Sequence, residues 1–155
     1  TLNELPQPSI ARVQGAAFGG AVGLVSCCDM AVAATAATFS LSEVKIGLVP
    51  ATIGPYVIAA IGERAARRYF TTAERFNAQT AKHIGLLSEV IDAEHLDNQV
   101  NLFIETLFLC RFWVFMQISG RSCLAQGLVF AGNTKFNRKL IGLLLDTDPL
   151  ASYLL

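Results

Sequence analysis

Four glycines lie close together in the stretch GAAFGGAVGLVSCCD, at positions 15, 19, 20 and 23, and the stretch ends at Asp29. If the chain turns sharply at residues 18–20 and enters a helix, the first amides of that helix lack acceptors and lie at the positive end of the helix dipole. Glycine has no Cβ that would keep a carbonyl group away, so the NH of Gly20 could donate to an oxyanion or enolate oxygen. Alternatively, the glycines only allow a helix to pack closely on a strand. A phosphate cradle is disfavoured, because neither GxGxxG nor the GxxxxGK pattern is present.

The second candidate is Glu43, in the stretch FSLSEVKIGLVPA. It has apolar residues on both sides and a loop rich in glycine and proline after it. A carboxyl group in apolar surroundings suits general acid or base chemistry near neutral pH. The alternative is a solvated loop acid, or a partner for Lys45.

The remaining polar candidates favour structural roles. Asp29 is placed to fix the end of its helix or a neighbouring loop. His83 suits the C-terminal end of a predicted helix, where a cation is favourable, and His95 is expected at the surface. Neither histidine has a companion at metal-ligand spacing, so we expect no metal site.

Composition predicts one folded domain that does not bind nucleic acid. The chain has 155 residues, a size typical of a single domain of about 100–150 residues. It is 53% hydrophobic, enough to bury a substantial core and too much for a disordered chain. Twelve basic and twelve acidic side chains balance to a net charge of zero, so no overall field attracts nucleic acid.

The sequence predicts neither export nor membrane insertion. The N-terminal stretch TLNELPQPSIARV lacks the pattern of a signal peptide. The most apolar stretch, residues 102–119, is interrupted by Glu105, Arg111 and Gln117, which favours a buried or interface helix over a membrane span. The four cysteines, at positions 27, 28, 110 and 123, show no CxxC spacing and are interpreted as reduced thiols of a cytoplasmic protein.

The coarse pattern alternates strands and helices. Apolar runs predict strands over 9–15, 30–34, 37–41 and 86–91, with a loop over 42–55. Helices are predicted over 20–28, over 56–70 with a break at Gly62, and over 77–85 with Asn77 as its start signal. From Ala93 onward one apolar stripe predicts another helix, formed by Leu96, Val100, Phe103, Ile104 and Leu107. Beyond Phe108 neither the two-residue period of a strand nor the 3.6-residue period of a helix persists. The sequence therefore suggests a partial domain over 1–107 and a divergent apolar segment of uncertain structure over 108–155.

The combined stretch PSIARVQGAAFGGAVGLVSCCDMAVAATAATFSLSEVKIGLVPA resembles the enoyl-CoA hydratase/isomerase family, also called the crotonase family. The likeness continues through AARRYFTTAERFNAQTAKHIGLLSEVI and covers residues 5–107. It implies an α/β fold, a partial crotonase-like ββα spiral with C-terminal helices, and assembly into trimers or hexamers. It also implies an acyl-CoA thioester as substrate, no external cofactor, and no nucleic-acid or membrane partner. The segment after Phe108 does not resemble the family's closing helices, which help to cover the acyl chain and build the trimer.

In the family, two backbone amides stabilise the thioester enolate. Gly20 matches the second donor, whereas the first would precede Thr1, so we expect the chain to be N-terminally incomplete or to use a donor from another chain. Family hydratases commonly carry two glutamates. Glu43 matches the second, and Gly23 occupies the place of the first.

A glycine at that place is usual in the bacterial methylglutaconyl-CoA or carboxygeranoyl-CoA hydratase branch, which the sequence resembles most. The resemblance therefore implies a lyase of fatty-acid or leucine catabolism that adds water to a branched, carboxylated enoyl-CoA. The substrate's own carboxylate would orient the water, and Gly23 would leave room for the branch. The residues expected to line the substrate site, besides Glu43 and Gly20 as catalytic groups, are Ala17, Phe18, Gly19, Gly23, Val49 and Pro50.

Three alternatives stay open. A double-bond isomerase can work with one glutamate. A non-catalytic fragment could retain a CoA-binding or oligomer-forming surface. Arg64, Arg67 and Arg68 lie at helical spacing and could meet CoA phosphates, although a solvated helix face is the better interpretation.

Overall fold

The computed structural model describes the backbone of residues 1–119 and the side chains of residues 1–109. The described part of the chain divides into two units, one made of residues 9–100 with Leu2, the other of residue 1, residues 3–8 and residues 101–119. The candidate residues all belong to the first unit, which is described first.

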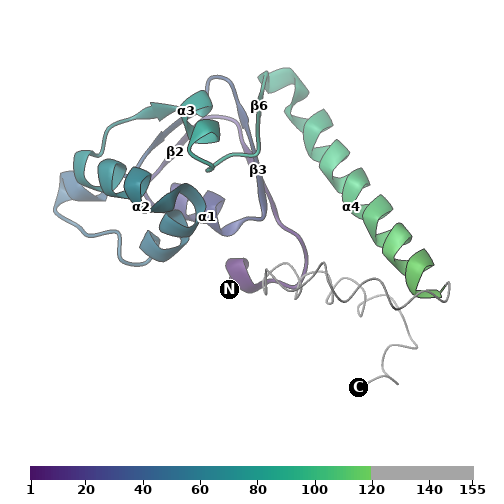
Figure 1. Cartoon of the computed structure of the whole chain (residues 1–155). Coiled ribbons are helices and arrows are strands. Elements are labelled where there is room, and N and C mark those ends of the chain that lie inside the picture. Colours follow the sequence, from purple (N-terminus) through teal and green to yellow (C-terminus); the bar gives the residue numbers. More distant parts are fainter. Residues whose placement is uncertain (120–155) are drawn as a thin grey trace. The chain divides into compact units, whose positions relative to one another are not determined.

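The first four strands of the first unit alternate between two small sheets, and β5 and β6 then add one strand to each sheet (Figure 1). The element order is β1 (Ile10–Val13), β2 (Ala16–Phe18), α1 (Gly20–Cys27), β3 (Met30–Ala34), β4 (Thr38–Ser40), α2 (Gly54–Thr72), β5 (Phe76–Asn77), α3 (Ala78–His83), β6 (Glu89–Ile91) and the start of α4 (Leu96–Ser119). Short 3-10 helices cover Leu2–Glu4, Glu43–Ile46 and Ala93–His95. The first two repeats each place one strand in each sheet and then a helix, which is the ββα spiral that the sequence predicts.

The strands of successive ββα repeats pair with one another. The first sheet has the order β1-β3-β6 and is parallel throughout, with Val13 opposite Ala33 and Ala33 opposite Val90. In the second sheet, of order β2-β4-β5, β2 and β4 are parallel and β4 and β5 are antiparallel. The central strand β3 is buried almost throughout, as expected for a strand between parallel neighbours.

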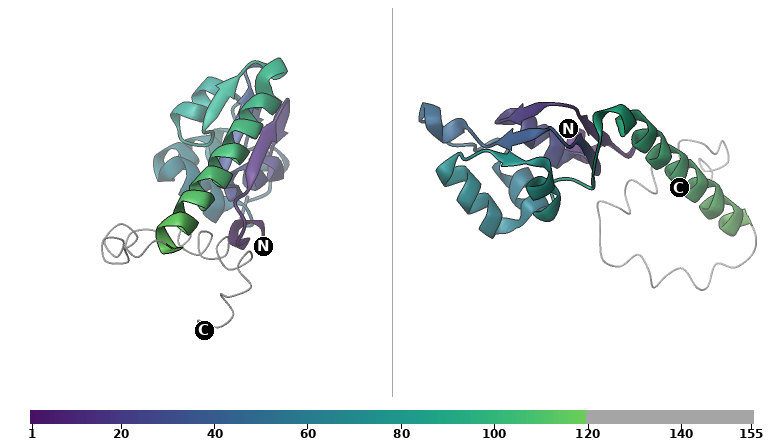
Figure 2. Two further views of the ribbon diagram at one scale, coloured as in Figure 1. Left: turned by 90° about the vertical axis from the view of Figure 1, so that its right-hand side faces the viewer. Right: turned by 90° about the horizontal axis from the view of Figure 1, so that it is seen from above.

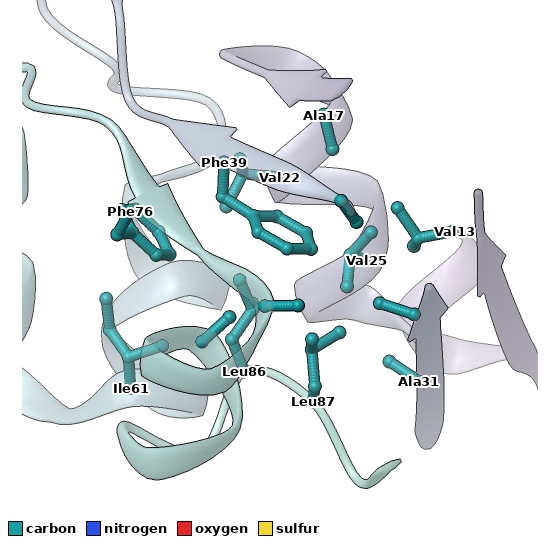
Figure 3. Packing of buried hydrophobic residues seen from close by; sticks show 14 of the residues in the cluster. Val13, Ala17, Val22, Val25, Ala31, Phe39, Ile61, Phe76, Leu86 and Leu87 are labelled. Carbon is teal, nitrogen blue, oxygen red and sulfur yellow. The ribbon is translucent and has the colours of Figure 1, made fainter. Parts of the chain in front are cut away.

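Between the sheets and the helices lies one apolar core (Figure 3). The Phe39 ring is fully buried and stacks on Phe76, with ring centroids 5.7 Å apart. Val22 and Val25 of α1 approach the same core from the helix side (Figure 3). Burial of a side chain as large as Phe39 contributes about 2–3 kcal/mol to folding.

Local signals set the ends of the helices. The side chain of Asn77 accepts a hydrogen bond from Thr80 N at 2.8 Å, so it is the N-cap of α3, as predicted. Gly62 breaks α2 with φ 77° and ψ 157°, which confirms two helical segments separated at that glycine. Ala73 ends α2 in a left-handed conformation, with φ 47°.

The main differences from the sequence predictions are β2 and a single helical turn. Residues 16–18, for which no strand was predicted, form a strand because their backbone pairs with β4. Residues 43–46, predicted as loop, form one turn of 3-10 helix. The strands predicted within 9–15, 30–34, 37–41 and 86–91 are confirmed, as is the helix within 20–28.

The second unit contains most of α4, which runs without interruption from Leu96 through Leu107 to Ser119 in both views of Figure 2. The predicted helix after Ala93 is therefore confirmed. It continues through residues 102–119, the stretch interpreted as a helix rather than a membrane span, although no regular period persists there beyond Phe108. Among the helices of the described residues, none combines the length and the apolar character that a bilayer span requires.

Candidate active site

The turn from β2 into α1 is built around Gly19. Its φ of 54° and ψ of −120° lie in a region that side chains with a Cβ rarely adopt. The Gly19 amide donates to the carbonyl of Ser40 at 2.9 Å, which ties the turn to the end of β4. Glycine is thus required here for the sharp entry into the helix.

Gly20 is the first residue of α1 and is exposed. A Cβ added to it would meet no atom within 4 Å. Val22 N and Gly23 N both bond to the carbonyl of Gly19, and among the described residues no backbone oxygen accepts the Gly20 amide. The structure therefore has the amide without a backbone acceptor at a helix N-terminus that the sequence predicts, with open space where a Cβ of residue 20 would lie.

Glu43 lies directly against this turn. Its Oε1 is 3.2 Å from the position that a Cβ on Gly19 would take. Its Oε2 is buried and has no hydrogen-bond partner among the described residues. The short helix that begins at Glu43 is fixed by bonds from Gly47 N and Leu48 N to the Glu43 carbonyl.

The alternative roles of Glu43 are not observed. Within the described part of the chain no ion pair joins Glu43 to Lys45. A buried carboxylate oxygen without a partner is costly in a folded protein, and a catalytic role is one reason for such an atom to be retained. The geometry therefore brings the predicted acid, Glu43, to the predicted amide turn.

Gly23 is buried one turn further along α1, and the expected room beside it is absent. A Cβ on Gly23 would lie 2.3 Å from Ile53 Cγ2 and 2.7 Å from Ile53 Cβ. The expectation that Gly23 leaves space for a branched acyl chain is therefore wrong, because Ile53 fills that space. Nothing in the sequence indicates this contact, since the two residues are thirty positions apart.

The other predicted lining residues differ in their surroundings. The Ala17 side chain is part of the core, whereas Phe18 is 37% exposed. Val49, 83% exposed, and the half-buried Pro50 belong to the loop after Glu43. Sequence reasoning missed Arg75, whose guanidinium lies 5.1 Å from the centroid of the Phe18 ring.

The loop that follows Glu43 is strongly apolar and exposed. Its exposed large side chains are Val44, Ile46, Leu48 and Val49, with Ile46 at 74%. An exposed apolar segment beside a buried acid is typical of a site that contacts an apolar ligand or another protein.

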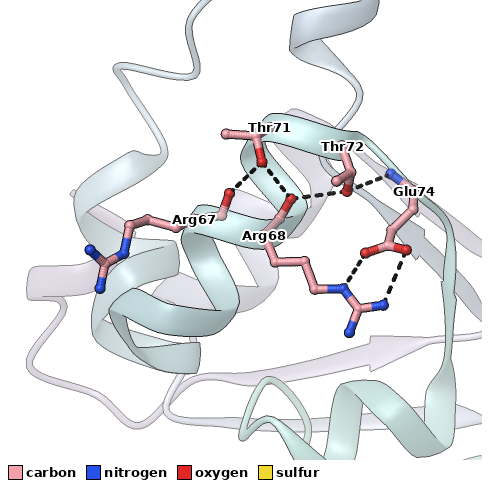
Figure 4. A network of polar contacts seen from close by, with 5 residues as sticks. All are labelled: Arg67, Arg68, Thr71, Thr72 and Glu74. Atoms are coloured by element: carbon pink, nitrogen blue, oxygen red, sulfur yellow. Dashed lines mark hydrogen bonds and ion pairs between the residues drawn. The ribbon is translucent and has the colours of Figure 1, made fainter.

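The basic residues of α2 are largely occupied by ion pairs (Figure 4). Arg68 makes two bonds to Glu74, Nε to Oε1 at 2.5 Å and Nη2 to Oε2 at 3.2 Å. The hydrogen bond from Arg68 lowers the pKa of Glu74, and the same bond raises the pKa of Arg68. Arg67 lies 3.8 Å from Glu63, and Arg64 is exposed. A solvated helix face thus describes Arg67 and Arg68 better than a phosphate site.

Asp29 fixes the chain ahead of β1. Its Oδ2 accepts bonds from Ser9 N at 2.9 Å and Ser9 Oγ at 2.8 Å, which confirms the structural role predicted for it. Cys27 is buried and Cys28 is half-buried, whereas the side chains of Cys110 and Cys123 lie outside the described residues. His83 and His95 are exposed, and the described part of the chain contains no cluster of metal-ligating side chains.

The family model described as enoyl-CoA hydratase/isomerase matches residues 1–111. The chain belongs to the enoyl-CoA hydratase/isomerase family. It is similar to enoyl-CoA hydratase ACTT6 of Alternaria alternata, with 40% identity over 97 residues that make up 62% of this chain and 33% of that protein. The mitochondrial methylglutaconyl-CoA hydratase of Mus musculus is 37% identical over 89 residues, which cover 57% of this chain and 28% of the relative.

Solved structures support the same assignment. The crystal structure of an enoyl-CoA hydratase from Shewanella pealeana matches with a TM-score of 0.68 and 39% identity, over 99% of this chain and 48% of that one. The α/β crotonase-type fold that the sequence predicts is thereby confirmed. The chain spans about a third of the length of the curated relatives named above.

Proposed function

We propose that this chain acts in the hydration of a carboxylated enoyl-CoA thioester. One observation carries the proposal: the Glu43 carboxylate, with a buried and unpartnered oxygen, lies against the glycine turn whose next amide is free. An acid beside an amide donor is what enolate chemistry needs. Membership of the enoyl-CoA hydratase/isomerase family supports the same reaction class.

The proposed reaction is the addition of one water molecule across the α,β double bond. The water oxygen bonds to the β carbon, the π electrons move toward the thioester carbonyl, and the α carbon then receives a proton. The Gly20 NH stabilises the negative charge on the thioester oxygen, and Glu43 moves the proton. The thioester itself is the electron sink, so no external cofactor is required.

The carboxylated substrate explains how one glutamate could suffice. Glycine at position 23 supplies no second acid, and the distal carboxylate of the substrate would orient the water in its place. The likeness to a methylglutaconyl-CoA hydratase supports this substrate class.

A second function, double-bond isomerisation, is favoured by the same glycine. With Ile53 packed against Gly23, Glu43 is the one acid that the described residues place at this turn. One carboxylate can take a proton from one carbon and return it to another without adding water.

The test follows the ultraviolet absorbance of methylglutaconyl-CoA with the full chain, together with mass spectrometry of the product. Loss of the enoyl absorbance with a gain of one water is expected, and Glu43→Gln should slow it by about 10²–10⁴-fold. The matched control is Glu74→Gln, which removes a carboxylate far from the turn in sequence and should leave the rate unchanged.

Other results would contradict parts of the proposal. A shifted double bond without a change in mass would identify the isomerase. Equal rates for an uncharged enoyl-CoA of the same length would remove the role of the substrate carboxylate. No reaction in folded protein would contradict the activity itself.

We also propose a homo-oligomer, a trimer or hexamer, as the assembled form. The exposed side chains of Ile46 and Val49 support it, because apolar surface of this kind is usually covered in an assembly. Light scattering of the purified chain would contradict the proposal by giving the mass of a monomer.

A further inference from the structure

Ile53 and Gly23 form an unusually close contact between the start of α2 and the middle of α1. The two shortest distances from a Cβ placed on Gly23 are 2.3 Å to Ile53 Cγ2 and 2.7 Å to Ile53 Cβ. Rotation about χ1 would move Cγ2 but cannot move Cβ, which is attached to the backbone. Any side chain at position 23 therefore requires a backbone shift as long as residue 53 carries a Cβ.

The backbone of Ile53 is itself well anchored. Tyr56 N and Val57 N donate to the Ile53 carbonyl at 3.1 and 3.0 Å, which fixes Ile53 to the first turn of α2. Val57 is fully buried in the core. A shift of residue 53 would thus disturb the packing of α2 against α1.

Ile53 and Glu43 occupy neighbouring places along α1. Gly19 and Gly23 are four positions apart, and the Gly23 amide bonds to the Gly19 carbonyl at 3.4 Å. Residues at this spacing lie on the same side of a helix. Glu43 contacts the first of these glycines and Ile53 the second, so an apolar side chain lies beside the acid.

We propose that Ile53 is a specificity-determining residue of this site. It fills the space into which a side chain at position 23 would project, so that no second acid can arise there by substitution of Gly23 alone. It also presents a half-buried apolar wall next to Glu43 that limits the size of the acyl group. The part that concerns the acyl group rests on the proposed function; the packing part does not.

Thermal unfolding of single and double variants of the full chain tests whether Ile53 excludes a side chain at position 23. Gly23→Ala should lower Tm by about 4–8 °C, because the added methyl overlaps Ile53. In the Ile53→Gly background the same substitution should raise Tm by a few degrees, because alanine is the better helix former and the space is now open. Ile53→Val, which keeps Cβ and Cγ2, is the matched control and should preserve the loss caused by Gly23→Ala.

The sign reversal is the decisive outcome. If Gly23→Ala changes Tm in the same direction in both backgrounds, Ile53 does not exclude a side chain at position 23 and the inference is overturned. Ile53→Gly lowers Tm by itself, but this does not affect the comparison, since each pair of variants differs only at position 23.

Substrate competition tests the acyl part. Ile53→Gly should raise the ratio of kcat/KM for a bulkier over a smaller enoyl-CoA by about 10-fold, and Ile53→Val should change it less. An unchanged ratio, with the Tm reversal intact, would overturn the specificity role. Absence of any Glu43-dependent turnover in the unmodified chain would instead count against the proposed function, while the Tm comparison would still decide the packing.

Discussion

Two glutamates show how differently the start of α1 and the end of α2 are built. Both carboxylate oxygens of Glu74 bond to Arg68, and the Glu74 amide bonds to Thr72 Oγ1 (Figure 4). Glu43, which lies against the turn before α1, has a buried oxygen with no partner among the described residues. The first arrangement satisfies every polar atom of the carboxylate, whereas the second keeps one oxygen without a bond.

The difference separates a region with a structural role from the region that we propose to be catalytic. Around Glu74, Ser40 Oγ donates to the carbonyl of Ala73 at 3.1 Å, so even the left-handed end of α2 is bonded to the sheet. Around Glu43 lie Gly19, the hydroxyl group of Ser42 and a following loop with exposed apolar side chains. Buried polar groups that only stabilise a fold are usually paired, so the unpaired oxygen of Glu43 is consistent with the catalytic role proposed for it.

The largest effect on stability is expected from a methyl group at the start of α1. Gly19→Ala forces alanine into φ 54° and places its Cβ 3.2 Å from Glu43 Oε1, so the free energy of unfolding should fall by about 1–3 kcal/mol. Gly20→Ala is the control, because its Cβ meets nothing within 4 Å and its φ is ordinary. Urea unfolding of both variants measures the difference, and equal losses would show that Gly19 is not the constrained position.

A smaller effect is expected when each glutamate loses its charge. Glu43→Gln removes a charge from a place where one oxygen has no partner, so the free energy of unfolding should rise by about 0.5–1 kcal/mol. Glu74→Gln breaks the ion pair with Arg68 and should lower stability slightly, less so at high salt. Chemical denaturation of both variants at two salt concentrations measures these changes. If the free energy of unfolding changes in the same direction in both variants, the two glutamates do not differ in the way proposed.

The smallest effect is a pH dependence at the end of α2. The hydrogen bond from Arg68 lowers the pKa of Glu74 below its ordinary 4.5. The folded chain therefore binds this proton less readily than the unfolded chain, so the contribution is present above pH 4.5 and is lost as the pH falls through the lower folded value.

Titration of the Glu74 side chain by NMR measures this shift directly. Arg68→Gln should return the pKa toward its ordinary value, since Arg68 is the main cause of the shift. Arg67→Gln is the matched control, because Arg67 pairs with Glu63 instead. An equal change in both variants would mean that general charge on α2, not the paired geometry, sets the pKa.

Local features of the site were predictable from the sequence, and long-range ones were not. Asn77 predicts the start of α3 because its side chain suits an N-cap. The unpaired amide of Gly20 follows from the rule that the first amides of a helix lack acceptors. β2 was missed because three residues beside glycines carry no strand pattern of their own, and pairing with β4 decides their conformation. The Gly23–Ile53 contact was misjudged for a similar reason: an absent side chain indicates space only until the neighbour from another element is known.

The alternation of strands between two sheets also bears on the order in which this chain can fold. β3 pairs with β1, twenty residues before it, and with β6, nearly sixty residues after it. During synthesis one edge of β3 therefore stays open while residues 35–88 emerge, an interval in which it can pair with another nascent chain. Completion of the sheet waits for Glu89–Ile91, so a chain interrupted before β6 would expose its central strand to aggregation.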